Sequence, residues 1–176
     1  EVSSDIQERV KEVVQTAENV LYADDFADSD AGWRAYIDED SVIDWFLVNE
    51  FCKNNDAIFF SSVYMYFNPA DGKLHLGPNW DFDISCGNID YNGCDDPTDW
   101  WIKNARWISR LFEDPAFVSA LQARWTETQS AVYACVNERI ASLGSENADS
   151  ADFNHSLALF PFLLALSRDD DLPMVF

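Results

Sequence analysis

The residues best suited to metal chemistry are two aspartates in the segment Gly77–Asp83. Asp81 and Asp83 are separated by a single residue. If the segment is extended, its period of two places both carboxylates on one face and Trp80 and Phe82 on the other. The aromatic side chains would then anchor the segment in the core. The carboxylates would suit Mg²⁺ or Mn²⁺, which prefer hard oxygen ligands. The alternative is that one aspartate caps a turn and the other is solvated.

Asp56 is the second candidate for a chemical role. It follows a polar turn, residues 53–55, and precedes a predicted hairpin whose far end leads to Asp81. A hairpin could return Asp81 to the neighbourhood of Asp56, which could then orient or deprotonate a hydroxyl nucleophile. Ser61 and Ser62 could help to bind metal or phosphate there. The plainer interpretations are an Asx-type turn at Asp56 and structural serines at the start of a strand.

The net charge of −21, from 32 acidic and 11 basic residues, restricts the possible partners. Binding to nucleic acid or to an anionic membrane surface needs clustered Lys and Arg, so both are disfavoured. A protein this acidic would need a divalent cation between itself and the phosphates of ATP. Solubility or adaptation to salt is the plainer explanation of the charge, and charge alone indicates no function.

Other common catalytic motifs are absent from the sequence. There is no GxSxG elbow and no glycine-rich phosphate loop, and His75 and His155 have no triad context. The cysteines show no CxxC spacing, which argues against a zinc site. Cys86 and Cys94 bracket a short loop and could close as a disulfide, with free thiols as the alternative.

Helices and one hairpin must position these residues. A capping box at Ser4 and Gln7 predicts a helix to about Tyr22. A second helix, from the signal at Ser41 to Phe51, is apolar almost all round, which is typical of a central, buried helix. Two apolar runs joined by a turn rich in Asn, Pro and Gly predict a β-hairpin, with strands over residues 63–67 and 73–77.

The second half of the chain returns to helical spacing. We expect a helix over Trp100–Phe112 and a long helix from Asp114-Pro115 to about Gly144. A last helix is predicted over Phe153–Ser167, kinked or broken near Pro161. The chain has no apolar run near the roughly 20 residues that span a bilayer. The prediction is therefore one domain over residues 1–176, an α+β fold that is mainly helical, without membrane insertion.

Taken in order, these motifs resemble those of the CotH (spore coat protein H) kinase-like family. The resemblance spans about Ile6 to Val132, and its most specific part is Gly77–Asp83 followed by Gly87-Asn88. Supporting segments are Tyr36–Glu50, Asn55-Asp56, Ser62–Tyr66, Gly72–Leu74, Ala105–Trp107, Leu111–Phe117 and Arg124-Trp125.

The resemblance implies the C-terminal lobe of an atypical protein-kinase-like fold. It also implies Mg²⁺–ATP-dependent phosphorylation of protein Ser or Thr. Asp81 would take the metal-binding role of the kinase DFG aspartate, with Asp83 as a supporting ligand. Asp56 would take the place of the catalytic-loop aspartate. Ser62 falls near the position at which a kinase has a metal-binding Asn. The serine differs from that Asn, which argues against binding of a second metal.

A further departure concerns the N-terminal lobe. A kinase needs a loop that covers the phosphates and a Lys–Glu pair, and this sequence begins in a helix without an initiator Met. We therefore expect the N-terminal lobe elsewhere in the same, longer polypeptide, and no kinase activity from this portion alone. The rival hypothesis is a non-catalytic, secreted or cell-surface binding module, such as a carbohydrate-associated one. Both hypotheses imply an extracellular or cell-surface location, and no role follows for residues 146–176.

Overall fold

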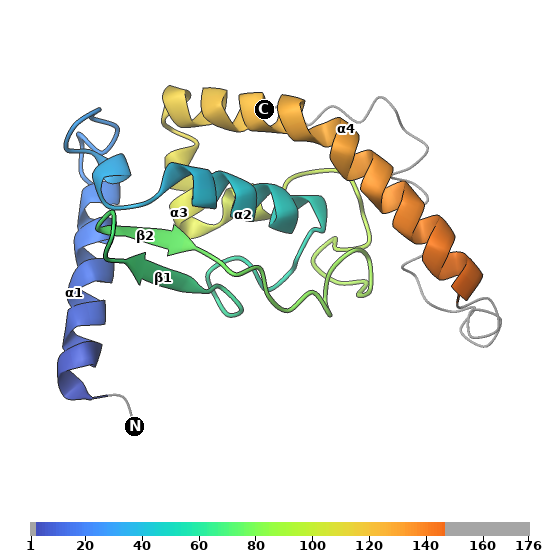
Figure 1. Cartoon of the computed structure of the whole chain (residues 1–176), viewed down its shortest axis with the longest axis horizontal. Coiled ribbons are helices and arrows are strands. Elements are labelled where there is room, and N and C mark those ends of the chain that lie inside the picture. Colours follow the sequence, from blue (N-terminus) through green and yellow to red (C-terminus); the bar gives the residue numbers. More distant parts are fainter. Residues whose placement is uncertain (1–2, 147–176) are drawn as a thin grey trace.

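The computed structural model describes residues 3–146, which form a mainly helical α+β arrangement with one hairpin (Figure 1). Its elements are α1 (Ser4–Leu21), η1 (Trp33–Ala35), α2 (Glu39–Phe51), β1 (Met65–Asn68), β2 (Lys73–Leu76), η2 (Ile102–Asn104), α3 (Arg106–Leu111) and α4 (Pro115–Glu146), where η denotes a 3₁₀ helix. Among these residues no helix is both long and apolar enough to cross a membrane. The helix predicted over Phe153–Ser167 lies outside the described residues.

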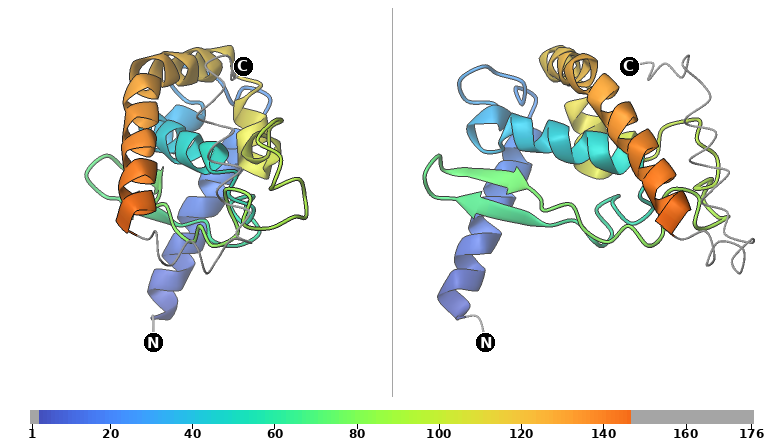
Figure 2. Two further views of the ribbon diagram at one scale, coloured as in Figure 1. Left: turned by 90° about the vertical axis from the view of Figure 1, so that its right-hand side faces the viewer. Right: turned by 45° about the vertical axis from the view of Figure 1, so that its right-hand side comes forward.

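Helix α2 lies at the centre, as its apolar sequence predicts, between α4 on one side and the hairpin on another (Figure 2). It begins at Glu39, earlier than the signal at Ser41 indicated. The reason is Asp38, whose carboxylate accepts the Ser41 N–H at 2.9 Å as the N-cap of the helix. The buried apolar residues that α2 itself contributes to the core are Val42, Ile43, Trp45, Phe46 and Leu47.

Helix α1 packs through its C-terminal half. Ala17 and Leu21 are buried, whereas Ile6 and Val10 are each 56% exposed on the half that stands clear of the body in Figure 1. The helix ends within one residue of the predicted Tyr22. The predicted capping box is wrong, because Ser3 occupies the N-cap and makes no side-chain cap hydrogen bond.

The predicted hairpin is confirmed, with shorter strands. β1 and β2 are antiparallel, with Tyr66 opposite His75 and Phe67 opposite Leu74. Leu74 also bridges in parallel to Ile37, and the Asp38 N–H donates to the Leu74 carbonyl at 2.8 Å. These bonds hold β2 against the start of α2. They therefore fix the position at which the segment after β2, residues 77–86, begins.

The prediction of one continuous helix over Trp100–Phe112 is wrong. The chain there forms η2 and α3, separated at Ala105, whose φ of −70° and ψ of 145° are extended. On the N-terminal side of this break, the Glu50 carboxylate of α2 accepts the N–H groups of Trp101 and Lys103, both at 2.8 Å. This contact fixes the start of η2 against α2.

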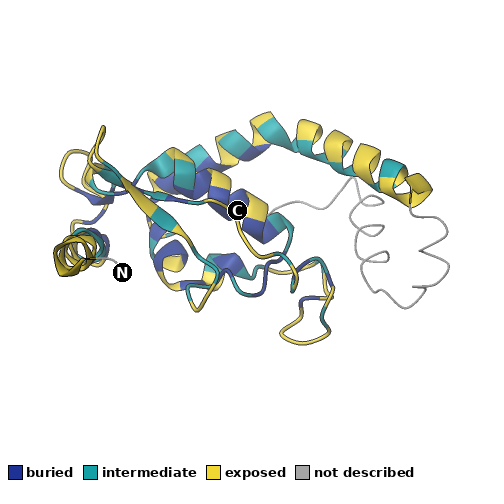
Figure 3. Cartoon of the chain, turned by 60° about the horizontal axis from the view of Figure 1, so that its bottom comes forward, coloured by how far each residue is buried: buried dark blue, intermediate teal, exposed yellow. Residues whose placement is uncertain are grey.

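Helix α4 begins at the predicted Asp114-Pro115 signal. The Asp114 carboxylate accepts the Ala116 N–H at 2.9 Å, the Trp33 indole N–H at 3.0 Å and the Arg34 guanidinium at 2.5 Å. It therefore caps α4 and joins it to η1. The first half of α4 packs on the core, and Figure 3 shows that its far half is mostly exposed. The buried residues of the first half are Phe117, Leu121 and Trp125.

Candidate functional site

Two loops that carry the predicted site residues are bonded side by side. One loop, residues 52–56, follows α2, and the other, residues 77–86, follows β2. The Asn55 N–H donates to the Ile84 carbonyl at 3.1 Å, and the Cys86 N–H donates to the Cys52 carbonyl at 2.7 Å. The hairpin therefore returns the Asp81 segment to the loop that carries Asp56, as expected from the order of elements.

Two buried asparagines hold the second loop in place. Asn49, near the end of α2, donates to the Asn79 side-chain oxygen at 2.8 Å. Asn54 donates to the Asn49 side-chain oxygen at 3.0 Å and to the Asp81 carbonyl at 3.2 Å. Both asparagines are at most 1% exposed. A buried amide that lost a partner would retain its desolvation cost, so this relay fixes the backbone beside Asp81.

Asp81 has a backbone conformation that L-residues rarely adopt. Its φ is +63°, and that of Ser62 is +54°. The Ser62 hydroxyl donates to the exposed Asp81 carboxylate at 3.2 Å, so the structure brings together these two predicted residues. Left-handed conformations of non-glycine residues cost about 1–3 kcal/mol each and cluster at ligand sites. The positive φ also means that the predicted extended alternation through Asp81 is wrong.

The predicted aromatic anchor of this loop is wrong for Trp80. Its side chain is 56% exposed. Within residues 3–146, its one aromatic contact is a T-shaped contact with Tyr64, with ring centroids 5.9 Å apart. Phe82 is part-buried. Anchoring comes instead from Asn49 and Asn54, which the sequence reading missed. The signal that could have indicated Asn49 is an asparagine inside a helix that is apolar almost all round.

Asp83 and Asp56 flank this arrangement. The Asp83 side chain is exposed, and its carbonyl accepts the Asn88 amide at 2.6 Å. Asp56 is part-buried, and its N–H donates to the Asn54 side-chain oxygen at 3.4 Å. Within residues 3–146, no Lys or Arg forms an ion pair with Asp56, Asp81 or Asp83. Their roles in metal binding and catalysis remain predictions.

The nearest lysine in sequence is engaged elsewhere. Lys53 is buried, and its ammonium group donates to the carbonyls of Asp96 at 2.6 Å and Thr98 at 2.7 Å. It therefore holds the acidic loop after Cys94 against the end of α2. Lys53 is therefore engaged by backbone carbonyls and not by the site carboxylates.

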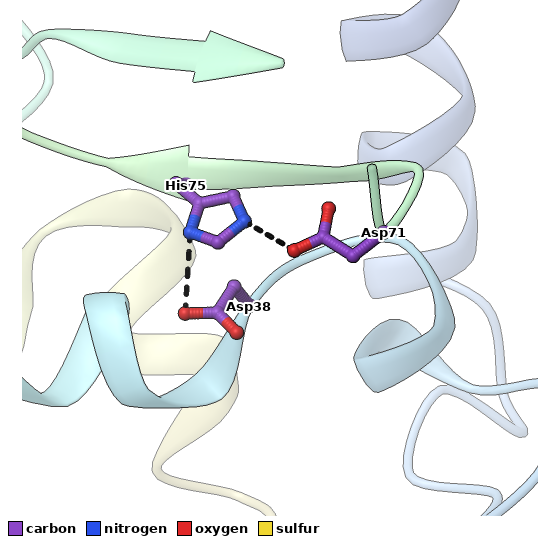
Figure 4. A group of neighbouring side chains, drawn as sticks. All are labelled: Asp38, Asp71 and His75. Carbon is purple, nitrogen blue, oxygen red and sulfur yellow. Dashed lines mark hydrogen bonds and ion pairs between the residues drawn. The ribbon is translucent and has the colours of Figure 1, made fainter. Parts of the chain in front are cut away.

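A second group of ligand-type side chains lies at the other end of the hairpin (Figure 4). His75 Nε2 is 2.8 Å from Asp71 Oδ2, and Nδ1 is 3.4 Å from Asp38 Oδ1. The imidazole also stacks on the ring of Tyr66, its cross-strand partner, with ring centroids 5.0 Å apart. The Lys73 N–H and then His75 hold the pKa of Asp71 below its ordinary value. One hydrogen bond to Asp71 and a longer contact to Asp38 account for this arrangement.

Comparison with known families gives one match. The family model described as CotH kinase protein matches residues 1–150, which include every element described above and all four predicted site residues. No curated protein and no solved structure matches the chain.

Proposed function

The chain belongs to the CotH kinase protein family, and from this premise we propose that it is the metal-binding lobe of an atypical protein kinase. The proposed reaction is transfer of phosphate from ATP to a Ser or Thr of a protein substrate, with Mg²⁺ or Mn²⁺. The observation that supports it best is the exposed Asp81 carboxylate, which has a strained backbone, a buried amide relay behind it and no cationic partner within residues 3–146.

The donor set fits a hard divalent cation. Asp81 would hold the ion with Asp83 as a supporting ligand, and the Ser62 hydroxyl already lies 3.2 Å from the Asp81 carboxylate. The bound ion would supply charge neutralisation between the ATP phosphates and a protein of net charge −21. Because the relay through Asn54 fixes the backbone of Asp81, this carboxylate would need little reorganisation to bind the ion.

The Asp56 carboxylate is suited to accept the proton of the substrate hydroxyl. It follows Asn54, which joins both loops, and it is part-buried. In the proposed reaction the Asp56 carboxylate accepts the hydrogen bond of the substrate hydroxyl and orients its oxygen toward the phosphate. Asp56→Asn would then reduce phosphate transfer while leaving metal–nucleotide binding largely unchanged, whereas Asp81→Asn would reduce both.

A second candidate function, non-catalytic binding, has support from exposed aromatic residues next to this site. Trp80 is 56% exposed, Tyr64 is 49% exposed, and Phe60 is 89% exposed. Aromatic faces of this kind can pack against sugar rings or apolar side chains of a partner. A binding module of this kind requires neither a metal ion nor ATP, so metal–nucleotide dependence separates the two functions.

Thermal unfolding with and without ligand tests the kinase proposal. The wild type, Asp81→Asn and the charge-matched control Asp24→Asn would be measured with Mg²⁺ or Mn²⁺, in the presence and absence of ATP. Asp24 is exposed in the loop after α1. At a ligand concentration of about 100 Kd, we expect Tm to rise by roughly 5–10 °C in the wild type and control. In Asp81→Asn the rise should disappear.

Two results would count against the proposal. An equal shift in Asp81→Asn would place the ligand elsewhere on the protein. No shift in any of the three proteins, at millimolar metal and ATP, would favour the binding function, which glycan or peptide-array binding by the wild type and loss of binding in Trp80→Ala would then test.

A further inference from the structure

A pair of cysteines joins the two loops of the candidate site. Cys52 is the C-cap residue of α2, and Cys86 ends the loop that carries Asp81. Both are free, as are Cys94 and Cys135. From the sequence, Cys86 and Cys94 were the candidates for pairing. In the structure Cys86 instead interacts with Cys52, and a hydrogen bond between the two thiols shifts the pKa of each.

The backbone geometry of this pair permits a covalent link. The Cys86 N–H donates to the Cys52 carbonyl at 2.7 Å. Standard bond lengths on either side of such a contact keep the two Cα atoms within about 6.5 Å of each other. Disulfide-linked residues have Cα separations of roughly 4.4–6.8 Å. The Cα separation of Cys52 and Cys86 therefore lies within the range that a disulfide requires.

The two thiols also differ in a way that suits thiol–disulfide exchange. The hydrogen bond from Cys52 lowers the pKa of the Cys86 thiol to about 7, against the effect of burial, and Ser85 adds to the lowering. The same hydrogen bond, followed by burial, raises the pKa of Cys52. Cys86 is thus the thiolate that attacks first near neutral pH, and Cys52 is the resolving thiol.

We propose that Cys52 and Cys86 are a redox-active pair, which closes as a disulfide by exchange with a low-molecular-weight disulfide. The Cys86 thiolate attacks one sulfur of that oxidant, which releases one thiolate and leaves a mixed disulfide on Cys86. The Cys52 thiol then loses its proton and attacks the Cys86 sulfur, which releases the second thiolate. The two cysteines are oxidised, the small disulfide is reduced to two thiols, and the end of α2 is joined covalently to the Asp81 loop.

Cys94 is the rival partner of Cys86, and its position disfavours that role. Its side chain is completely buried, and its sulfur lies 3.5 Å from the Lys53 carbonyl and 3.7 Å from the Ile84 carbonyl, as a donor to both. Burial raises the pKa of Cys94, so it has little thiolate at neutral pH. The Cys52–Cys86 link does not depend on the proposed function, because it rests on the loop contacts alone.

Mass spectrometry of the wild-type chain tests the pair without any substitution. The protein would be incubated near pH 7.5 with glutathione disulfide, alkylated under denaturing conditions and digested. We expect a loss of two alkylated thiols and a cross-linked peptide that contains Cys52 and Cys86. Cys135→Ser, at an exposed position on α4, should give the same cross-link. The link closes a loop of about 35 residues, so Tm should rise by roughly 5–10 °C on oxidation and fall back on reduction.

Three results of this experiment would overturn the proposed pairing of Cys52 and Cys86. A Cys86–Cys94 cross-link in the wild type would assign the pairing to the acidic loop instead. Four alkylated thiols after incubation, together with ready labelling of Cys86 in the folded protein, would show that the thiol is accessible and still does not pair. Stable glutathionylation of Cys86 without a cross-link would likewise exclude Cys52 as its partner.

Discussion

Asparagines contribute more to this site than their sequence context suggests. Asn54 reaches three places at once, namely the Asn49 amide, the Asp81 carbonyl and the Asp56 N–H. Each of these contacts is local to the loops, yet together they determine where the Asp81 carboxylate lies. The site is therefore as sensitive to an uncharged residue as to its charged ones.

Asn54→Ala should destabilise the protein by about 2–3 kcal/mol, because the buried Asn49 side-chain oxygen and the Asp81 carbonyl both lose the amide that donates to them. The matched control is Asn88→Ala, whose exposed amide donates to the Asp83 carbonyl and should cost less than about 1 kcal/mol. Urea unfolding monitored by tryptophan fluorescence measures both. Equal, small losses in the two variants would show that the relay is not a structural element.

Asp114 gives the fold a pH dependence of known sign. Burial alone would raise its pKa, but hydrogen bonds from Trp33 and Arg34 more than offset this and hold the pKa below its ordinary value. The ionised form therefore favours the folded state. Its contribution is complete above the unfolded pKa of about 3.9 and is lost as pH falls through the lower folded value.

Asp114→Asn should lower the free energy of unfolding by about 3 kcal/mol at pH 7, because Arg34 loses its buried partner. The difference from wild type should stay constant from pH 7 to about pH 5.5 and shrink as pH falls below about 4. Asp40→Asn is the control, since its pair with Arg124 is exposed and contributes little. A difference that grows on acidification would reverse the assigned sign.

At the level of elements, the boundaries were harder to predict than the elements themselves. The apolar surface of α2, the turn residues of the hairpin and the Asp114-Pro115 signal each predicted an element that exists. Where prediction failed, a contact from elsewhere in the chain decided the outcome. Glu50 holds the start of η2 after Trp100, and a long-range relay replaces the aromatic anchor at Trp80. No local pattern encodes either contact.

Gly32 shows how closely the loop after α1 folds on itself. A Cβ atom at this position would lie 2.3 Å from the carbonyl oxygens of Phe26 and Asp28. Because both obstacles are backbone atoms, Gly32→Ala should cost about 2–3 kcal/mol. Gly144→Ala is the matched control, since it has open space within α4 and should stabilise the protein by about 0.5 kcal/mol. Chemical denaturation of both variants would refute this if Gly32→Ala were neutral.

For the whole molecule, charge is the dominant feature. A net charge of −21 produces self-repulsion that opposes the compact state. With EDTA present to exclude divalent ions, raising NaCl from about 10 mM to 0.5 M should increase Tm by several degrees, because the Debye length falls from about 30 Å to below 5 Å. A decrease in Tm would mean that attractive pairs such as Arg34–Asp114 outweigh the repulsion.

The sequence pointed to the family before the fold was known, and the family match over residues 1–150 confirms that identification. The sequence could not reveal that Cys52 and Cys86 come together, because 33 intervening residues must fold before these thiols meet. Nor could it show that Asp81 and Ser62 share a strained region, since a positive φ depends on contacts made from both loops. The site residues came from motif and order, and their arrangement required the structure.

Direct binding of Mn²⁺ measures the proposed metal–nucleotide site most closely. Electron paramagnetic resonance would quantify free Mn²⁺ over wild type, Asp81→Asn and Asp24→Asn, each with and without ATP. The proposed function predicts one site in the wild type and in Asp24→Asn with an affinity for Mn²⁺–ATP higher than that of the nucleotide-free ion, and at least a tenfold loss in Asp81→Asn. Equal binding by all three proteins would contradict it, because the ion would then respond to the overall acidity of the chain and not to Asp81.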